Sequence, residues 1–125
     1  MPDKEVGQIV RAHYKSGTYI GEITEDRGDR FLITVLAVQK HPMQGDLHNP
    51  GQVEDVFFHE RKALAYKEKV NVAKPAVHPY EDEVPDYAPS RQNAVNKLKE
   101  KLAYKDSDFN KKALKTLEEL EKQYQ

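Results

Sequence analysis

A proline-rich, acidic stretch around residue 80 divides the sequence into two parts that follow different hydrophobic periods. Residues 75–89 read PAVHPYEDEVPDYAP and hold Pro75, Pro79, Pro85 and Pro89 together with four carboxylates. Because proline lacks a backbone N–H and has a fixed φ, this stretch favours extended chain over helix. We therefore interpret residues 78–89 as a stiff connector between a strand-forming part and a helix-forming part.

The first part has the composition of short strands joined by tight turns. Residues 6–14, 18–24 and 31–38 are rich in Val, Ile, Thr and aromatic residues, and strand character returns at 61–66 and 70–77. Ser16-Gly17 and Arg27-Gly28-Asp29 are turn signals between the first three runs, which predicts an antiparallel meander. Apolar residues alternate on both faces of 31–38, a pattern typical of a central strand in a curled sheet or small barrel.

The second part has the period of helices. Two amphipathic runs are separated by Asp106-Ser107-Asp108, and Ser90 is placed to cap the first helix. The apolar positions are Ala94, Val95, Leu98 and Leu102 in the first run, and Phe109, Ala113, Leu114, Leu117, Leu120 and Tyr124 in the second. Isolated helices of this length are marginal in water, so we expect a helical hairpin over 90–125 that packs on the barrel. The alternative is that part of the apolar stripe is left for a partner.

A long loop, residues 41–56, interrupts the strands and reads HPMQGDLHNPGQVEDV. Its prolines and glycines set specific turns, so we expect the loop to be ordered and packed on the barrel. His41, Asp46 and His48, with His59 just beyond, have side chains that suit zinc or iron. No HExxH or other paired-ligand spacing occurs, so we favour hydrogen bonds from these groups to the loop backbone and expect no cofactor. A metal-binding protein or metal-dependent enzyme built on His41, Asp46, His48 and His59 remains the alternative.

Composition excludes several other functions. The 125 residues include no cysteine, which rules out disulfides, thiolate metal sites and a lipid-bearing cysteine in this sequence. The formal net charge of −1 gives no support for nucleic-acid binding. No apolar run reaches membrane-spanning length, and no catalytic motif such as GxSxG or a P-loop occurs. We therefore expect a cytoplasmic protein without direct membrane insertion that is not an enzyme.

Candidate residues for binding a partner lie at the first turn and around the long loop. Tyr14 and Tyr19 flank the turn over 15–18, where small barrels use tyrosines to grip extended peptides. The alternative is that these tyrosines close the barrel with their hydroxyls in water. The remaining candidates are the polar residues of the loop and of the segment after it, His41, Asp46, His48, His59 and Arg61.

Four segments carry a family resemblance. They are GQIVRAHYKSGTYIGEI at 7–23, HPMQGDLHNP at 41–50, FFHERKALAY at 57–66 and PYEDEVPDY at 79–87. Together and in this order they resemble the kinase-associated lipoprotein B family of spore-forming Gram-positive bacteria, nearly from end to end. The loop and the FFHER segment are the distinctive pieces.

The resemblance implies a mainly β fold: an SH3-like β-barrel over residues 1–77, with the long loop 41–56, followed by the connector and the helical hairpin. It also implies a regulatory accessory of a membrane sensor histidine kinase in the sporulation phosphorelay, and it brings no catalytic residues. Because the sequence has no cysteine to carry a lipid, we expect recruitment to the inner membrane face only through the kinase. The residues leave open whether the protein forms a homo-oligomer.

Overall fold

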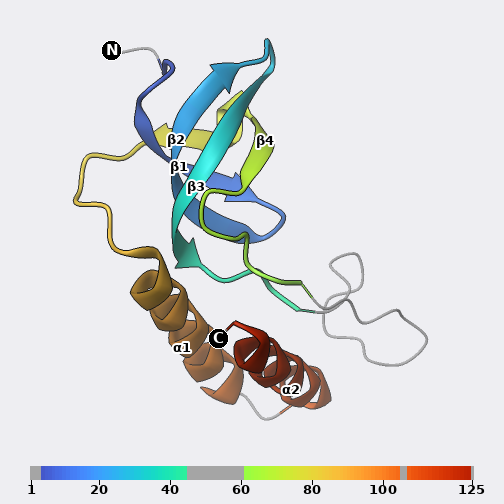
Figure 1. Ribbon diagram of the computed structural model, residues 1–125. Helices are drawn as coiled ribbons and strands as arrows, with labels where there is room; N and C mark the ends of the chain where they lie inside the picture. The colour runs from blue at the N-terminus through green and yellow to red at the C-terminus, as the bar shows by residue number, and fades with distance from the viewer. Residues whose placement is uncertain (1–3, 45–60, 105–106, 125) are drawn as a thin grey trace.

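The computed structural model describes residues 4–44, 61–104 and 107–124. Within them the chain forms five strands, a short 3₁₀ helix and two α-helices (Figure 1). The elements are β1 (Ile9–Tyr14), β2 (Gly17–Asp26), β3 (Arg30–Lys40), β4 (Lys69–Ala73), η1 (Lys74–Ala76), β5 (Val77–Pro79), α1 (Tyr87–Tyr104) and α2 (Asp108–Gln123). Residues 45–56, on which most of the loop prediction rests, lie outside the described residues.

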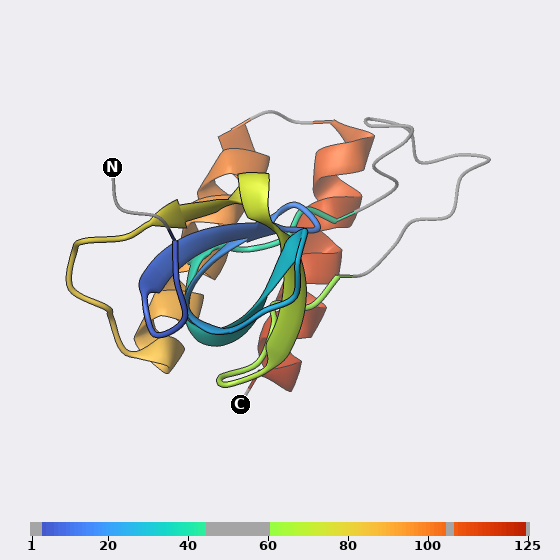
Figure 2. The ribbon, with the colours of Figure 1, turned by 90° about the horizontal axis from the view of Figure 1, so that it is seen from above.

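The five strands form one antiparallel sheet in the order β4-β3-β2-β1-β5. The sheet curls around its own apolar face, as the view in Figure 2 shows, but its two edge strands do not pair with each other. The predicted fold class, an SH3-like small barrel followed by a helical hairpin, is confirmed, with the barrel left open between β4 and β5.

The barrel core comes from alternate residues of the strands. Side chains of β3 are buried at every second position from Phe31 to Ala37, as the sequence pattern predicts. Gly21 in β2 allows β3 to approach closely, because a Cβ there would lie 2.5 Å from the carbonyl oxygen of Thr34. The innermost cluster is Val10, Ala12, Ile23, Phe31, Ile33, Val72 and Val77.

Two predicted strands differ in the structure. Residues 61–66 alternate in sequence but form no strand, because the amides of Ala63 and Leu64 donate to tyrosine hydroxyls rather than to a neighbouring strand. The predicted strand 70–77 is divided by η1, which has Pro75 in its first turn. The break carries the chain from β4, which pairs with β3, to β5, which pairs with β1 at the opposite edge.

The helices begin at different kinds of residue. Ser107, within the segment that separates the two predicted helical runs, caps α2, because its Oγ accepts the N–H of Asn110 at 3.1 Å. The prediction that Ser90 caps the first helix is wrong, because α1 already begins at Tyr87 and Pro89 is tolerated in its first turn. The hydroxyl of Ser90 is buried instead, where it donates to the carbonyl of Tyr87 at 2.6 Å and accepts the N–H of Val38 at 3.0 Å.

The helical hairpin packs against one end of the barrel (Figure 1). Ala94 of α1 joins a second buried cluster with Tyr19, Val35, Val38 and Ala63. Val95 and Leu98 face α2, where they pack against Leu117. The apolar stripes of both helices are therefore buried in part against each other and in part against the barrel.

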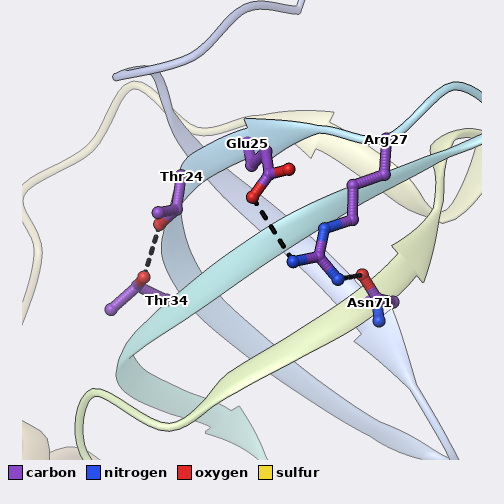
Figure 3. Close-up of polar contacts among 5 residues, drawn as sticks. All are labelled: Thr24, Glu25, Arg27, Thr34 and Asn71. Atoms are coloured by element: carbon purple, nitrogen blue, oxygen red, sulfur yellow. Dashed lines mark hydrogen bonds and ion pairs between the residues drawn. The ribbon is translucent and has the colours of Figure 1, made fainter.

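Polar contacts tie three strands together at a distance from the helices (Figure 3). The hydroxyls of Thr24 and Thr34 are hydrogen-bonded across β2 and β3. Arg27 donates to Glu25 and to Asn71 of β4, each at 3.3 Å. These are largely exposed contacts, which individually contribute little to stability.

Candidate functional site

A pocket of about 280 Å³ opens beside the turn between β1 and β2. It combines residues that lie far apart in the sequence, among them three of the predicted partner-binding candidates, Tyr14, Tyr19 and Arg61. We call it the turn pocket; its walls are Tyr14, Lys15, Tyr19, Pro42, Arg61, Lys62, Leu64 and Glu68.

The β1–β2 turn has a tight, left-handed backbone. Lys15 and Ser16 have φ of 45° and 67°, a pair of positive values that two-residue hairpins of type I′ require. Gly17 follows, and a Cβ on it would lie 2.6 Å from the hydroxyl of Tyr19, so glycine here lets the tyrosine ring lie against the strand. The Oγ of Ser16 accepts the N–H of Met43 at 3.0 Å, which ties the turn to the chain beyond β3.

The two tyrosines of the turn have different environments. Tyr19 is only 2% exposed, and its hydroxyl accepts the N–H of Leu64 at 3.4 Å. Burial raises the pKa of Tyr19 well above its ordinary value, so the ring is neutral and forms the floor of the pocket. Tyr14 is half-buried and contacts both apolar clusters of the barrel, with the ammonium of Lys15 5.3 Å from the centre of its ring. Tyr14 and Lys15 are therefore residues of this turn that line the pocket and remain accessible to a ligand.

His41 lies behind the pocket and is 1% exposed. Its Nδ1 is 2.9 Å from the carbonyl oxygen of Pro42, which can only accept, so Nδ1 carries the proton. Its Nε2 then accepts from the hydroxyl of Tyr124 at 2.7 Å, and the same hydroxyl accepts the N–H of Ala63 at 2.8 Å. Burial lowers the pKa of His41, in agreement with a neutral ring. The imidazole joins the end of β3, the segment after residue 60 and the end of α2, and both of its nitrogens are occupied within the protein.

Gln44 and Arg61 join the two described chain ends that flank residues 45–60. The side chain of Gln44 accepts the N–H of Arg61 at 2.8 Å and donates to its carbonyl at 2.9 Å. The guanidinium of Arg61 in turn donates to the carbonyl of Met43 at 3.3 Å. Gln44 is 2% exposed, so the amide acts as a buried substitute for a strand pairing and fixes the position of Arg61 in the pocket wall.

The charge of the turn pocket is mainly positive. Among the described residues, Lys15, Arg61 and Lys62 line it together with one carboxylate, Glu68, whose Oε1 already accepts the N–H of Ala65 at 2.9 Å. A half-buried tyrosine beside cationic side chains suits an extended, acidic protein segment, because the ring provides apolar contact and the cations bind carboxylates.

The predicted metal ligands are only partly described. Asp46, His48 and His59 lie outside the described residues, so neither a metal site nor a partner contact at these positions can be assigned. Residues 4–44, 61–104 and 107–124 contain no group of three His, Asp or Glu side chains that could hold a metal. Both ring nitrogens of His41 are engaged, so His41 could join a metal site only by breaking one of these two hydrogen bonds.

Sequence reasoning missed several residues that build the site. Pro42, Lys62 and Glu68 line the pocket, and Tyr87 and Tyr124 support it through Leu64 and His41. The basic pair of Arg61 and Lys62 was a visible signal in the sequence. The hydrogen bond from Tyr124 to His41 joins residues 83 positions apart and leaves no local sequence signal.

The fold and the pocket define a small SH3-like barrel carrying a C-terminal helical hairpin. The family model of "Kinase associated protein B" matches residues 14–125, and the chain belongs to this family. It is 49% identical over 120 residues to "Kinase-associated lipoprotein B" of Bacillus subtilis (strain 168), covering 96% of this chain and 94% of that protein. The crystal structure of kinase-associated protein B from Bacillus cereus superposes with a TM-score of 0.82 at 38% identity, covering 96% of both chains. No α-helix in the described part of the chain has the length and apolar character needed to cross a bilayer.

Proposed function

We propose that the protein is a non-enzymatic regulatory binding protein that associates with a sensor histidine kinase and promotes its activity in the sporulation phosphorelay. Membership of a family described as kinase-associated supports a kinase-associated role. The observation that carries the proposal is the turn pocket, which presents Tyr14, Lys15, Arg61 and Lys62 on a barrel whose neighbouring polar groups are already hydrogen-bonded.

Such a protein activates a kinase by binding its active conformation more tightly than its inactive one. A tenfold shift in the kinase equilibrium needs a difference of about 1.4 kcal/mol between the two binding free energies. Two or three charge-assisted hydrogen bonds from the pocket to carboxylates of the kinase are sufficient for that difference if these bonds form only in the active state of the kinase.

Capture from sporulating cells tests the proposal directly. Tagged full-length protein should retain one membrane sensor histidine kinase, identified by mass spectrometry, and should raise the autophosphorylation rate of that purified kinase. Lys15→Glu/Lys62→Glu reverses two exposed charges of the pocket and should abolish both effects. Lys69→Glu/Lys115→Glu makes the same change in net charge at exposed lysines outside the pocket and should preserve both effects.

Two results would contradict the proposal in different ways. If no histidine kinase is retained by the unsubstituted protein, the kinase partner is wrong. If a kinase is retained equally by Lys15→Glu/Lys62→Glu, the partner is right but the turn pocket is not the contact. Elemental analysis of the same preparations tests the metal-based alternative. One equivalent of zinc or iron that survives dialysis would support that alternative.

A further inference from the structure

A second hollow lies on another side of the molecule, between the end of β3 and α1. Two cavities of about 160 and about 110 Å³ adjoin there and share Gln39, Ala94 and Lys97. We call this the lysine groove; its floor and basic rim are Gln39, Lys40, Ala94, Lys97, Leu98 and Lys101.

Helical spacing places the groove residues of α1 on one face. Ala94, Lys97, Leu98 and Lys101 follow the i, i+3, i+4, i+7 pattern, with Lys40 of β3 beside them. Ala94 and Leu98 are buried and form an apolar floor. None of the three lysines of the rim makes an ion pair with any residue that the structure describes.

The acidic connector borders the same groove. Tyr80 and Pro85 line the larger cavity together with Asn93 and Lys97 of α1. Figures 1 and 2 both show the connector running from β5 to the start of α1 along this side of the molecule. Its carboxylates are exposed and, among the described residues, form no ion pairs; they are Glu81, Asp82, Glu83 and Asp86.

One face of the molecule therefore carries a strip of unpaired carboxylates next to a strip of unpaired lysines, with apolar surface between them. A face of this kind is complementary to itself, because a two-fold axis between two copies places each acidic strip opposite the basic strip of the other. Val84 and Pro85 interrupt the acidic strip. In this arrangement their apolar side chains come near the floor residues Ala94 and Leu98 of the second copy.

We propose that this face is a homodimer interface, in which the acidic connector of one copy lies in the lysine groove of a second copy. The two cavities are small, so we expect an interface at the low end of the range for specific complexes, with a dissociation constant on the order of 10–100 µM. The charge pairs lie at the surface, so dimerisation should weaken as salt rises.

Sedimentation velocity of the full-length protein at increasing concentration measures the association. At about 50 mM salt a monomer–dimer equilibrium should appear, and about 500 mM salt should weaken it at least about fivefold. Lys97→Glu/Lys101→Glu should weaken the dimer at least about tenfold, because each attractive contact becomes repulsive in both halves of the interface. Lys69→Glu/Lys115→Glu, with the same change in net charge, should leave the constant within about twofold of the original.

A charge swap separates the interface from a general effect of the substitutions. Glu81→Lys/Glu83→Lys should also weaken the dimer, and combining it with Lys97→Glu/Lys101→Glu should restore association by exchanging the signs of the two strips. Circular dichroism checks that each variant is folded. If Lys97→Glu/Lys101→Glu is not folded, Lys97→Gln/Lys101→Gln takes its place. A chain that stays monomeric at millimolar concentration and low salt would overturn the proposal. Equal weakening of the dimer by Lys97→Glu/Lys101→Glu and by the control Lys69→Glu/Lys115→Glu would also overturn it. So would a variant that combines the lysine and glutamate reversals and does not associate.

Discussion

Removing one hydroxyl tests whether the contact between His41 and Tyr124 holds the barrel, the segment after residue 60 and α2 together. Tyr124→Phe keeps the ring, and with it the guanidinium of Arg91 at 4.5 Å from the ring centre. It also keeps the hydrogen bond that Arg91 donates to the carbonyl of Tyr124 at 2.6 Å. The substitution removes the bonds of the hydroxyl to Nε2 of His41 at 2.7 Å and to the N–H of Ala63 at 2.8 Å.

The magnitude follows from the burial of the two groups that lose a partner. His41 is 1% exposed and Ala63 is 9% exposed, so water cannot fully replace the hydroxyl. A buried polar group left without a partner costs about 1–3 kcal/mol. We expect Tyr124→Phe to lower the free energy of unfolding by about 2 kcal/mol, with the penalty at Ala63 reduced by its partial access to water.

Urea unfolding followed by circular dichroism measures this change, read as a lower midpoint with an unchanged slope. Hydrogen exchange locates it, because the amide of Ala63 should exchange faster in the variant. Tyr104→Phe is the matched control, since Tyr104 is 92% exposed and should change stability by less than about 0.5 kcal/mol. If Tyr124→Phe loses no more stability than Tyr104→Phe, the hydroxyl does not stabilise this junction and the reasoning fails.

Four further outcomes are expected. Gly21→Ala should cost about 1–3 kcal/mol in thermal melts, because its Cβ would lie 2.5 Å from the carbonyl of Thr34 and the strands would have to move apart. Ser90→Ala should cost about 1–3 kcal/mol in urea, because the N–H of Val38 loses its partner. The free energy of unfolding should fall as pH drops below about 6.5, because His41 then binds a proton in the unfolded chain but, with its lowered pKa, stays neutral in the folded protein. His41→Gln should therefore make the free energy of unfolding depend less on pH between about pH 7.5 and 5.5. Removing α1 and α2 should leave a markedly less stable or insoluble barrel, and a truncated barrel that melts like the full-length protein would count against burial of the hairpin.

The parts of the fold that the sequence predicted are those set by periodicity and by local chemistry. Alternation in β3 identified a strand that lies inside the sheet, between β4 and β2, and the spacing of apolar residues in 90–125 identified two helices. Ser107 was recognisable as a cap because its partner, the N–H of Asn110, lies three residues away. In each of these cases the interacting groups are neighbours in the sequence or follow one repeating period.

Prediction failed where a distant side chain replaced a local partner. Residues 61–66 alternate like a strand, but the amides of Ala63 and Leu64 bond to the hydroxyls of Tyr124 and Tyr19. Ser90 has the side chain of a cap, but its hydroxyl accepts from Val38, 52 residues earlier. Residue type showed correctly that these groups need hydrogen-bond partners, whereas the identity of the partner depends on the tertiary fold.

The same reasoning explains why His41 could be read as a metal ligand, a partner contact or a structural group. All three roles need a histidine near other polar groups, and the sequence around residue 41 provides that proximity without its geometry. The structure adds the direction of both ring nitrogens, one toward the carbonyl of Pro42 and one toward Tyr124, and the burial that keeps the ring neutral. A neutral, fully bonded histidine behind the turn pocket holds the pocket wall in place while Lys15 and Arg61 line the opening. A substitution at His41 should therefore act on kinase association through the stability of the pocket, whereas one at Lys15 should act on association alone.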